Sequence, residues 1–322
     1  MTEVFVESEF APLRTVVLAQ SELALPQDIP DVELAFLPAG SNETISAGQD
    51  FGAAFPRRQQ LWLRERRNFE AVLLRYGVEV LRPRMLTAAE KAAAGSDGYA
   101  NFFVRDPFFT IGDVVIEGSL RFRHRRREVL PVRDILLKRV YPTLCDYVAV
   151  PAPEIAADDD ATLWPGPFLE GGDVLVLDKH VLVGTSGLAS NELGARWLAK
   201  LLAPRGYTVE VIRLAPDILH LDCALGLIRD GLLVVCEEAL LDGVPAALKS
   251  WERIPVSPSQ TKDLATNGLP ISPDVYVTDP VFGWIGEQLE HHGVTVEYVE
   301  FGISRSLGGA FRCSTQPLLR RR

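Results

Sequence analysis

The sequence lacks any apolar run close to the roughly 20 residues that span a bilayer. Its first residues show no basic region followed by an apolar stretch, so no secretory signal peptide is expected there. Only four cysteines occur in 322 residues, and none has the CxxC spacing of metal or redox sites. These absences predict a cytoplasmic protein with reduced thiols, no metal and no cofactor.

Basic residues are also in the minority. There are 33 Lys and Arg against 43 Asp and Glu, which gives a net charge of −10. This balance disfavours nucleic acid as a partner and favours a small cationic ligand. No membrane partner is expected, because no apolar run is long enough to span a bilayer. The two basic clusters, 121–127 and 320–322, are interpreted as solvated surfaces. Because 47% of the residues are hydrophobic and no linker is evident, residues 1–322 are expected to form a single domain with a large core.

One pattern recurs along the chain: an amphipathic helix, a Gly or polar turn, and a strand of alternating apolar residues. Hairpins with turn residues near 112, 178 and 230 precede several of these helices. The predicted helix–strand pairs are 59–75 with 77–81, 132–140 with 147–150, 192–202 with 206–211, 238–251 with 254–256, and 285–292 with 293–299. An α/β fold whose units share one core is therefore expected.

The ends of the chain suggest how these units are arranged. Closing them into a ring would remove exposed sheet edges and pair the last strand, around 311–318, with the first, 13–18. An open mixed sheet with ordinary crossovers is the alternative that periodicity leaves open. The polar stretches 40–49 and 156–162 are interpreted as surface loops.

Two segments place acids where they could bind a ligand. In 101–108, Asp106 lies within an apolar strand and needs a partner, for which Arg105 is one candidate. In 169–173, Glu170 and Asp173 flank two glycines. Such glycines either allow a ligand to approach the backbone closely or form a tight turn with exposed acids.

Two further segments supply a base and a nucleophile. In 220–223, His220 and Asp222 would share one face of a strand, and histidine suits proton transfer near neutral pH. In 306–315, a Gly-Gly loop delivers Cys313, whose thiolate would be stabilised by Arg312 or a protonated His220. The other cysteines are expected to be buried in apolar surroundings and the other histidines to lie at the surface: Cys145, Cys223, Cys236, His124, His180, His291 and His292.

These groups form a set suited to one chemistry. Carboxylates bind a planar guanidinium through paired charge-assisted hydrogen bonds, and a Cys with a His can perform covalent catalysis. The four segments, in this order, resemble the guanidino-group-modifying superfamily, also called penteins, which includes amidinotransferases, arginine deiminases and dimethylarginine hydrolases. The resemblance runs from about residue 101 to the C-terminus. It implies a five-fold pseudosymmetric α/β propeller of ββαβ units.

The resemblance also implies roles for individual residues. The catalytic set is the nucleophile Cys313, the general acid/base His220, and the acids Glu170 and Asp106. The substrate-binding set is Asp222, Asp173, Arg125 and Asn101, with Asp222 and Asp106 gripping the guanidinium and Arg125 the best candidate for a substrate carboxylate.

The motifs divide between two branches of the superfamily. Residues 116–128 resemble the amidinotransferase run I-E-A-P-M-A-W-R-x-R-x-x-E, and 306–313 resemble S-L-G-G-G-F-H-C with Arg312 in place of the His. The segment 170–173 and the basic run 125–128 instead resemble deiminases and hydrolases. Residues 186–189 depart from S-x-R-T, whose Arg helps to hold the substrate carboxylate in deiminases.

The preferred hypothesis is an amidinotransferase that moves an amidino group from L-arginine to an amine through a covalent thiouronium intermediate. The alternative is a deiminase-like or dimethylarginine-type hydrolase that releases citrulline. A non-catalytic pentein and a protease-type Cys-His hydrolase rank lower, because neither explains why the acids, His220 and Cys313 occur together. A homodimer is a further hypothesis.

Overall fold

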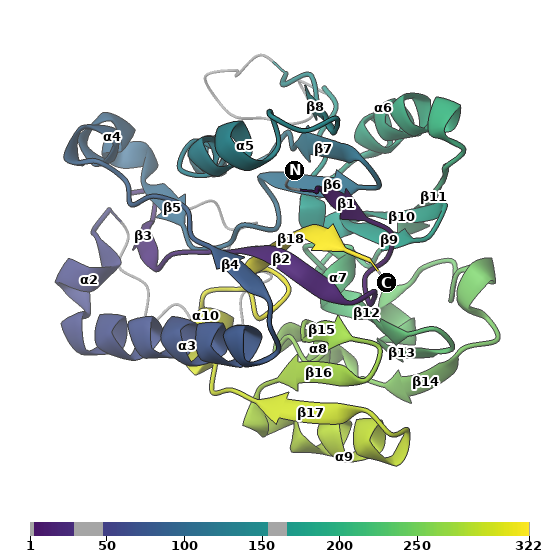
Figure 1. The fold of residues 1–322 in the computed structure, drawn as a ribbon. Helices are drawn as coiled ribbons and strands as arrows, with labels where there is room; N and C mark the ends of the chain where they lie inside the picture. The colour runs from purple at the N-terminus through teal and green to yellow at the C-terminus, as the bar shows by residue number, and fades with distance from the viewer. Residues whose placement is uncertain (1–2, 29–47, 154–165, 322) are drawn as a thin grey trace.

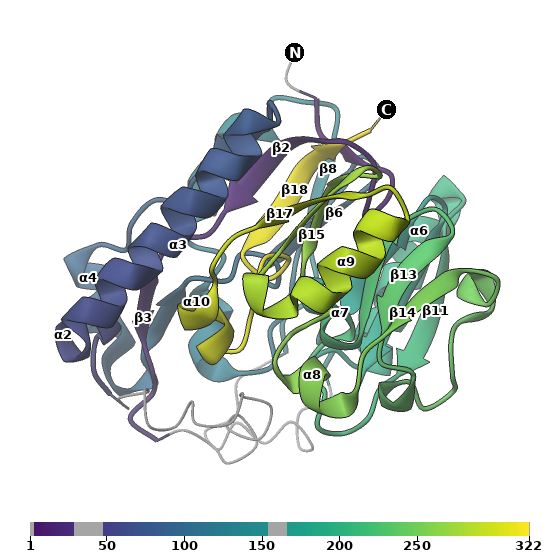
Figure 2. The same ribbon diagram turned by 90° about the horizontal axis from the view of Figure 1, so that it is seen from below.

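The computed structural model describes residues 3–28, 48–153 and 166–321. These residues form a mixed α/β structure of several small sheets with helices on the outside (Figures 1 and 2). The polar stretch 156–162 and all of 40–49 except its last two residues lie outside the described residues. Within the described part of the chain, no helix has both the length and the apolar character needed to cross a membrane.

Five sheets share one design, in which two strands run antiparallel and a third pairs parallel with the second. Four of them follow one another along the chain: β6 (Phe108–Ile111), β7 (Val114–Glu117) and β8 (Asp146–Ala149); β9 (Val174–Leu177), β10 (His180–Thr185) and β11 (Thr208–Arg213); β12 (Leu225–Arg229), β13 (Leu232–Val235) and β14 (Glu252–Pro255); β15 (Leu269–Ser272), β16 (Val275–Thr278) and β17 (Thr295–Tyr298). The predicted hairpins and third strands are therefore confirmed.

The fifth sheet joins the two ends of the chain. Strand β18 (Thr315–Arg320) runs antiparallel to β2 (Leu13–Leu18), and β2 runs parallel to β4 (Glu79–Leu81). The short β1 (Phe5–Val6) adds to the other side of β18. The predicted pairing of the last strand with the first is confirmed. A separate two-stranded sheet consists of β3 (Glu22–Ala24) and β5 (Tyr99–Asn101).

Helices connect the second and third strands in four of the five sheets. They are α3 (Pro56–Arg75), α5 (Arg133–Arg139), α6 (Glu192–Leu202) and α9 (Gly283–His291). The helix predicted over 238–251 is wrong, because only two 3₁₀ turns form there, η6 (Glu237–Ala239) and η7 (Ala246–Leu248). Between them, Gly243 has a φ of +72° and Pro245 lacks a backbone donor, and both features interrupt a helix.

Helix α3 shows how the sequence sets this packing. Pro56 at its first position needs no hydrogen-bond partner for its nitrogen, and the chain turns at Gly77 with a φ of +73°. The buried positions follow helical spacing and are Trp62, Glu65, Arg66, Phe69, Val72 and Leu73. Two charged side chains therefore lie on the face that packs inward.

Short helices lie in the remaining connections: α2 (Phe51–Ala54), α4 (Ala88–Ala94), α7 (Leu221–Ala224), α8 (Pro258–Lys262) and α10 (Gly302–Ser306). In Figure 2, α7, α8 and α10 gather towards the end of the sheets opposite the two termini. Two of the four motif segments identified in the sequence adjoin α7 and α10.

Candidate active site

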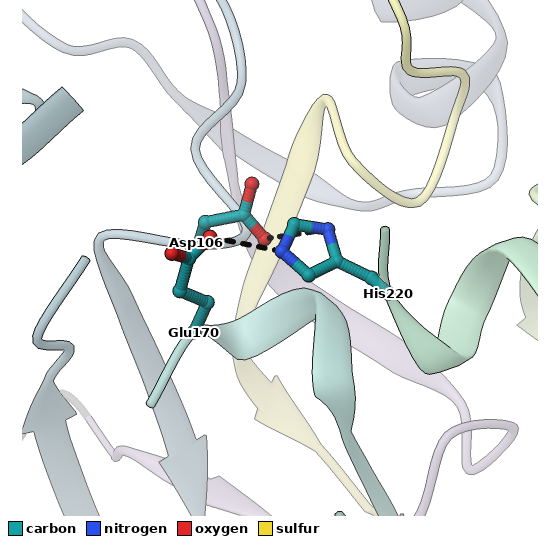
Figure 3. A group of neighbouring side chains, drawn as sticks. All are labelled: Asp106, Glu170 and His220. Carbon is teal, nitrogen blue, oxygen red and sulfur yellow. Dashed lines mark hydrogen bonds and ion pairs between the residues drawn. The ribbon is translucent and has the colours of Figure 1, made fainter. Parts of the chain in front are cut away.

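Three buried side chains from distant segments meet in the interior (Figure 3). Asp106 lies just before β6, Glu170 just before the turn η4 (Gly171–Asp173), and His220 just before α7. Nε2 of His220 is 2.9 Å from Oε2 of Glu170, and Nδ1 of His220 is 3.8 Å from Oδ1 of Asp106. Their residues are at most 2% exposed, so these charges meet with little screening by water.

Arg125 closes this cluster from the other side. Its guanidinium is 2.7 Å from Oδ2 of Asp106, 3.2 Å from Oε2 of Glu170 and 2.8 Å from Oε1 of Glu128. The interpretation of 121–127 as a solvated surface is therefore wrong at Arg125, which the turn η3 (Arg123–Arg127) carries inward. Within the described chain, Arg105 forms no ion pair with Asp106, so that candidate pairing is also wrong.

Charge in this cluster favours a protonated imidazole. Burial alone lowers the pKa of His220, but the carboxylates of Asp106, Asp173 and Glu170 raise it to about 10. Burial likewise opposes ionisation of Asp106, yet His220 and Arg125 lower its pKa to about 2. Burial raises the pKa of Asp173 to about 7, against the pull of His220. At neutral pH the site thus holds a cationic His220 beside an ionised Asp106.

The glycines of the 169–173 segment allow the close packing at this centre. The amide of Gly172 donates to Oδ1 of Asp106 at 2.9 Å, and a Cβ at this position would lie 2.7 Å from both Asp106 and His220. Glu170 and Asp173 are both buried, so a tight turn with exposed acids is the wrong interpretation. Asp173 accepts bonds from the amides of Ser190 and Leu221, which tie η4 to α7.

The loop that carries Cys313 is held by its backbone. The Cys313 amide donates to Oδ1 of Asn267 at 3.2 Å, as does the Ala310 amide, and the Cys313 carbonyl accepts from Val104 and Arg105 at 3.1 Å each. The side chain is 3% exposed, with Sγ 3.8 Å from Oδ2 of Asp222. The nucleophile predicted from the sequence is therefore fixed beside a predicted guanidinium-binding acid.

Asp222 approaches the site from a helix. His220 is the N-cap and Asp222 the second residue of α7, so the prediction that they share one face of a strand is wrong. Nη1 of Arg312 is 2.8 Å from Oδ2 of Asp222, and the same guanidinium binds both carboxylate oxygens of Glu9 at 3.0 and 3.1 Å. The other oxygen of Asp222, Oδ1, is 3.7 Å from Sγ of Cys223. A thiol is a weak donor, so Oδ1 retains acceptor capacity.

The charges around Cys313 favour its thiol form. Burial, followed by the charges of Asp222 and Asp106, raises its pKa well above the usual value, and Arg312 offsets this only in part. Ionisation therefore requires additional positive charge near Sγ.

Some predicted residues lie elsewhere. The side-chain amide of Asn101 donates to Oε2 of Glu22 and to the carbonyl of Arg84, and within the described structure it makes no hydrogen bond to the His220 cluster. His124 is half-buried rather than at the surface, and burial and then Arg125 lower its pKa to about 3. Cys145 is half-buried, whereas Cys223 and Cys236 are buried as expected.

Three buried residues around the site were not predicted from the sequence. Glu9 and Asn267 lie in segments without a recognisable motif, and nothing local indicates that they meet Arg312 and Cys313. Arg66 had a detectable signal, because it lies at an inward position of the amphipathic α3.

Asp106, Glu170 and His220 could also offer three ligand atoms to a metal, since these atoms lie within 4.8 Å of one another. The Arg125 guanidinium, however, already binds both carboxylates. A cation at this position would therefore compete with an existing one, so the arrangement fits acid–base chemistry better than metal ligation.

Comparisons with known proteins show which family the chain resembles. The family model described as arginine deiminase matches residues 99–260. Inosamine-phosphate amidinotransferase 1 of Streptomyces griseus is 29% identical over 98% of this chain and 96% of its own length, and glycine amidinotransferase of Xenopus tropicalis is 24% identical over 78% and 67%.

Solved structures show the same fold. An amidinotransferase of saxitoxin biosynthesis from Microseira wollei superposes with a TM-score of 0.81 at 21% identity, covering 99% of this chain and 98% of that one. DDAH from Pseudomonas aeruginosa superposes with a TM-score of 0.65 at 17% identity, covering 95% and 99%. By its family match over half its length and its order of motifs, the chain belongs to the arginine deiminase family of the guanidino-group-modifying, or pentein, superfamily.

Proposed function

We propose that this protein is an amidinotransferase that moves an amidino group from L-arginine to an amine, with Cys313 as nucleophile. The observation that carries the proposal is the contact of the buried Cys313 Sγ with Oδ2 of Asp222 at 3.8 Å. Although burial opposes it, the acids around His220 raise its pKa to about 10, which favours the protonated imidazole. Asp106 connects the two groups, because its charge acts on both the thiol and the imidazole. The similarity to named amidinotransferases along 98% of the chain favours transfer over hydrolysis.

Substrate binding would supply the missing positive charge. A guanidinium between Asp222 and Asp106 would find an acceptor at Oδ1 of Asp222, whose contact is the weak thiol donor of Cys223. The cationic group would compensate the two acids that raise the pKa of Cys313. The thiol would then lose its proton to solvent, and the thiolate would form next to the guanidino carbon that it attacks.

The first half-reaction forms an S–C bond and breaks a C–N bond. The Cys313 thiolate adds to the guanidino carbon, the bond to the side-chain nitrogen of arginine breaks, and His220 gives its proton to that nitrogen. Ornithine leaves, and the amidino group remains on Cys313 as a thiouronium. Glu170, 2.9 Å from Nε2, keeps the imidazole oriented for this transfer.

The second half-reaction reverses these roles. Neutral His220 accepts a proton from the incoming amine as its nitrogen attacks the amidino carbon, and the C–S bond breaks to regenerate the enzyme. Citrulline would instead require a terminal guanidino nitrogen to leave as ammonia, so that the ornithine part stays on the thiouronium when water attacks it. Water attacking the amidino group after ornithine has left would give urea. Transferase and hydrolase therefore differ both in the nitrogen that leaves and in the nucleophile that reaches the intermediate. The segment 170–173 resembles the deiminases and hydrolases, and its acids Glu170 and Asp173 are both buried in the site. The hydrolase is therefore the second candidate function.

Incubation with L-arginine, with and without a panel of amines, tests the proposal. Ornithine that appears only when an amine is present, together with an amidinated amine, is the expected result. Citrulline formed from arginine alone would instead establish the hydrolase. Ornithine and citrulline are separable by chromatography, so one assay distinguishes the two outcomes.

A matched pair of cysteine variants tests the nucleophile. Cys223 and Cys313 are both buried and lie 3.7 and 3.8 Å from opposite oxygens of Asp222. We expect Cys313→Ala to abolish turnover and to form no covalent adduct in mass spectra, whereas Cys223→Ala keeps both. Retained turnover in Cys313→Ala would refute the assignment.

We further infer that the five sheets are the blades of a five-fold pseudosymmetric propeller formed by residues 1–322 as one domain. The repeated strand order and the joining of β2 with β18 support this arrangement. We place the enzyme in the cytoplasm, where its four free cysteines would remain reduced.

A further inference from the structure

Helix α3 carries a buried cation behind the nucleophile. Arg66 is 1% exposed, and its guanidinium donates to the carbonyl of Gln20 at 3.3 Å, to Oγ of Ser304 at 2.9 Å and to the carbonyl of Phe102 at 3.0 Å. All three acceptors are neutral. Among the residues that the structure describes, Arg66 forms no ion pair with any acid, so its charge is not cancelled by a bonded carboxylate.

The adjacent Glu65 accepts hydrogen bonds from α10 and, in the described structure, forms no ion pair with Arg66. Its carboxylate accepts from the amides of Ile303 and Ser304 at 2.6 and 3.0 Å and from the Ser304 hydroxyl at 2.8 Å. Glu65 and Arg66 together therefore hold the start of α10, which lies alongside α3 in both views (Figures 1 and 2).

These contacts lead directly to the cysteine loop. The chain passes from α10 through Gly309 to Cys313, and a Cβ at Gly309 would lie 2.4 Å from the ring of Phe103. Arg66 thus binds two segments that contact the cysteine loop. One is α10, through Ser304, and the other is the segment of Phe102 and Phe103. Phe102, Phe103 and Cys313 belong to one packed cluster.

The charge on Arg66 also acts on the thiol. Burial lowers the pKa of Arg66 to about 9, and among its neighbours Glu65 and the Cys313 thiolate raise it while Arg82 lowers it. Arg66 is therefore still cationic at neutral pH. Cys313 otherwise interacts with Asp222, Asp106, Cys223 and Arg312.

Of these neighbours, Arg312 is a cation, and it is bound by Glu9 and Asp222. Unlike Arg312, Arg66 has no bonded acid among the described residues. Positive charge near a buried thiol favours the thiolate.

We propose that Arg66 is a positioning residue for Cys313: it holds the cysteine loop through Ser304 and Phe102 and supplies the positive potential that stabilises the thiolate. The proposal rests on the proposed function only in taking Cys313 as the nucleophile. It adds a residue on α3, outside the four motif segments, on which the reactivity of the Cys313 thiol depends.

The pH dependence of Cys313 alkylation by iodoacetamide tests this without any turnover, with the modified peptide quantified by mass spectrometry. In Arg66→Met we expect alkylation to be about tenfold slower at a fixed pH near 8, equivalent to a thiol pKa about one unit higher. Arg66→Lys should keep most of the rate, because it keeps the charge. Arg58→Met is the matched control, since Arg58 lies on α3, donates to Oγ of Ser306 on α10 and, among the described residues, forms no hydrogen bond or ion pair with Cys313.

Equal alkylation rates in folded Arg66→Met and Arg58→Met would overturn the proposal. Equally slow rates in Arg66→Met and Arg66→Lys would overturn its electrostatic part and leave only the mechanical one. If Arg66→Met does not fold, Arg66→Gln replaces it as the uncharged variant. Failure of the proposed function has a different signature, namely wild-type protein that alkylates normally at Cys313 but yields no ornithine with any amine.

Discussion

Glu9 is expected to be a major source of stability although it lies far from every motif in the sequence. Its two oxygens are 3.0 and 3.1 Å from Nε and Nη2 of Arg312, a residue 303 positions away, and it also accepts a bond from the Val176 amide. All of these groups are buried. Replacing Glu9 by Gln keeps the shape but leaves the Arg312 charge with Asp222 as its single ion-pair partner.

The magnitude follows from the burial and the charges. Although burial opposes it, Arg312 and Arg105 lower the pKa of Glu9 from 4.5 to about 2, which corresponds to about 3 kcal/mol of pH-dependent stability at about 1.4 kcal/mol per pH unit. Because the folded-state pKa is depressed, this stability is fully present above pH 4.5 and is lost as the pH falls towards 2. Breaking a buried pair by removing one partner costs about 3–5 kcal/mol.

Urea unfolding at pH 7, followed by circular dichroism, measures this loss in Glu9→Gln. The matched control is Glu7→Gln, since Glu7 is partly exposed and its side chain has no ion pair among the described residues. The control should change the unfolding free energy by less than about 0.5 kcal/mol. A loss below about 1 kcal/mol in folded Glu9→Gln would refute the reasoning that this carboxylate neutralises a buried cation.

Four further predictions concern the site. His220→Asn should lower kcat roughly 100- to 10,000-fold by removing the proton donor. The group acts as an acid when protonated, so wild-type activity should fall as the pH rises through about 10, and Glu170→Gln should move that fall to lower pH in a kcat profile. Gly172→Ala should reduce kcat even where the variant remains folded by its Tm, because the new Cβ would lie 2.7 Å from His220 and displace the imidazole. An unchanged kcat would contradict this. Asn267→Ala should cost about 1–3 kcal/mol of stability and reduce kcat, because the buried Cys313 amide loses its acceptor; wild-type values for both would show that water replaces Asn267.

The hairpins and the third strands were predictable because each depends on local pattern. Alternating apolar residues around a turn specify a hairpin without knowledge of its neighbours, as at 108–117 and 174–183. The helix predicted over 238–251 was wrong for a local reason too. The prediction gave more weight to the apolar residues of this segment than to Gly243 and Pro245, which interrupt the helix in the structure.

The site was predictable as a set of residues but not as an arrangement. Cys313, His220 and the acids stand out by their chemistry and by their order along the chain. His220 was assigned to a strand, and in the structure it begins α7. Arg125 looked like part of a solvated basic run, and in the structure it binds three buried carboxylates.

The sequence by itself determined the repeating strand design and the residues that carry chemistry, because these depend on spacing and residue type. It suggested the pairing of the chain ends, which the β2–β18 ladder then decided. Only the tertiary structure decided which charge neutralises which. Any arginine can pair with any acid, and the choice depends on packing between segments as distant as Glu9 and Arg312 or Glu170 and His220. Burial then sets the pKa values of these groups, and burial is a property of the whole fold.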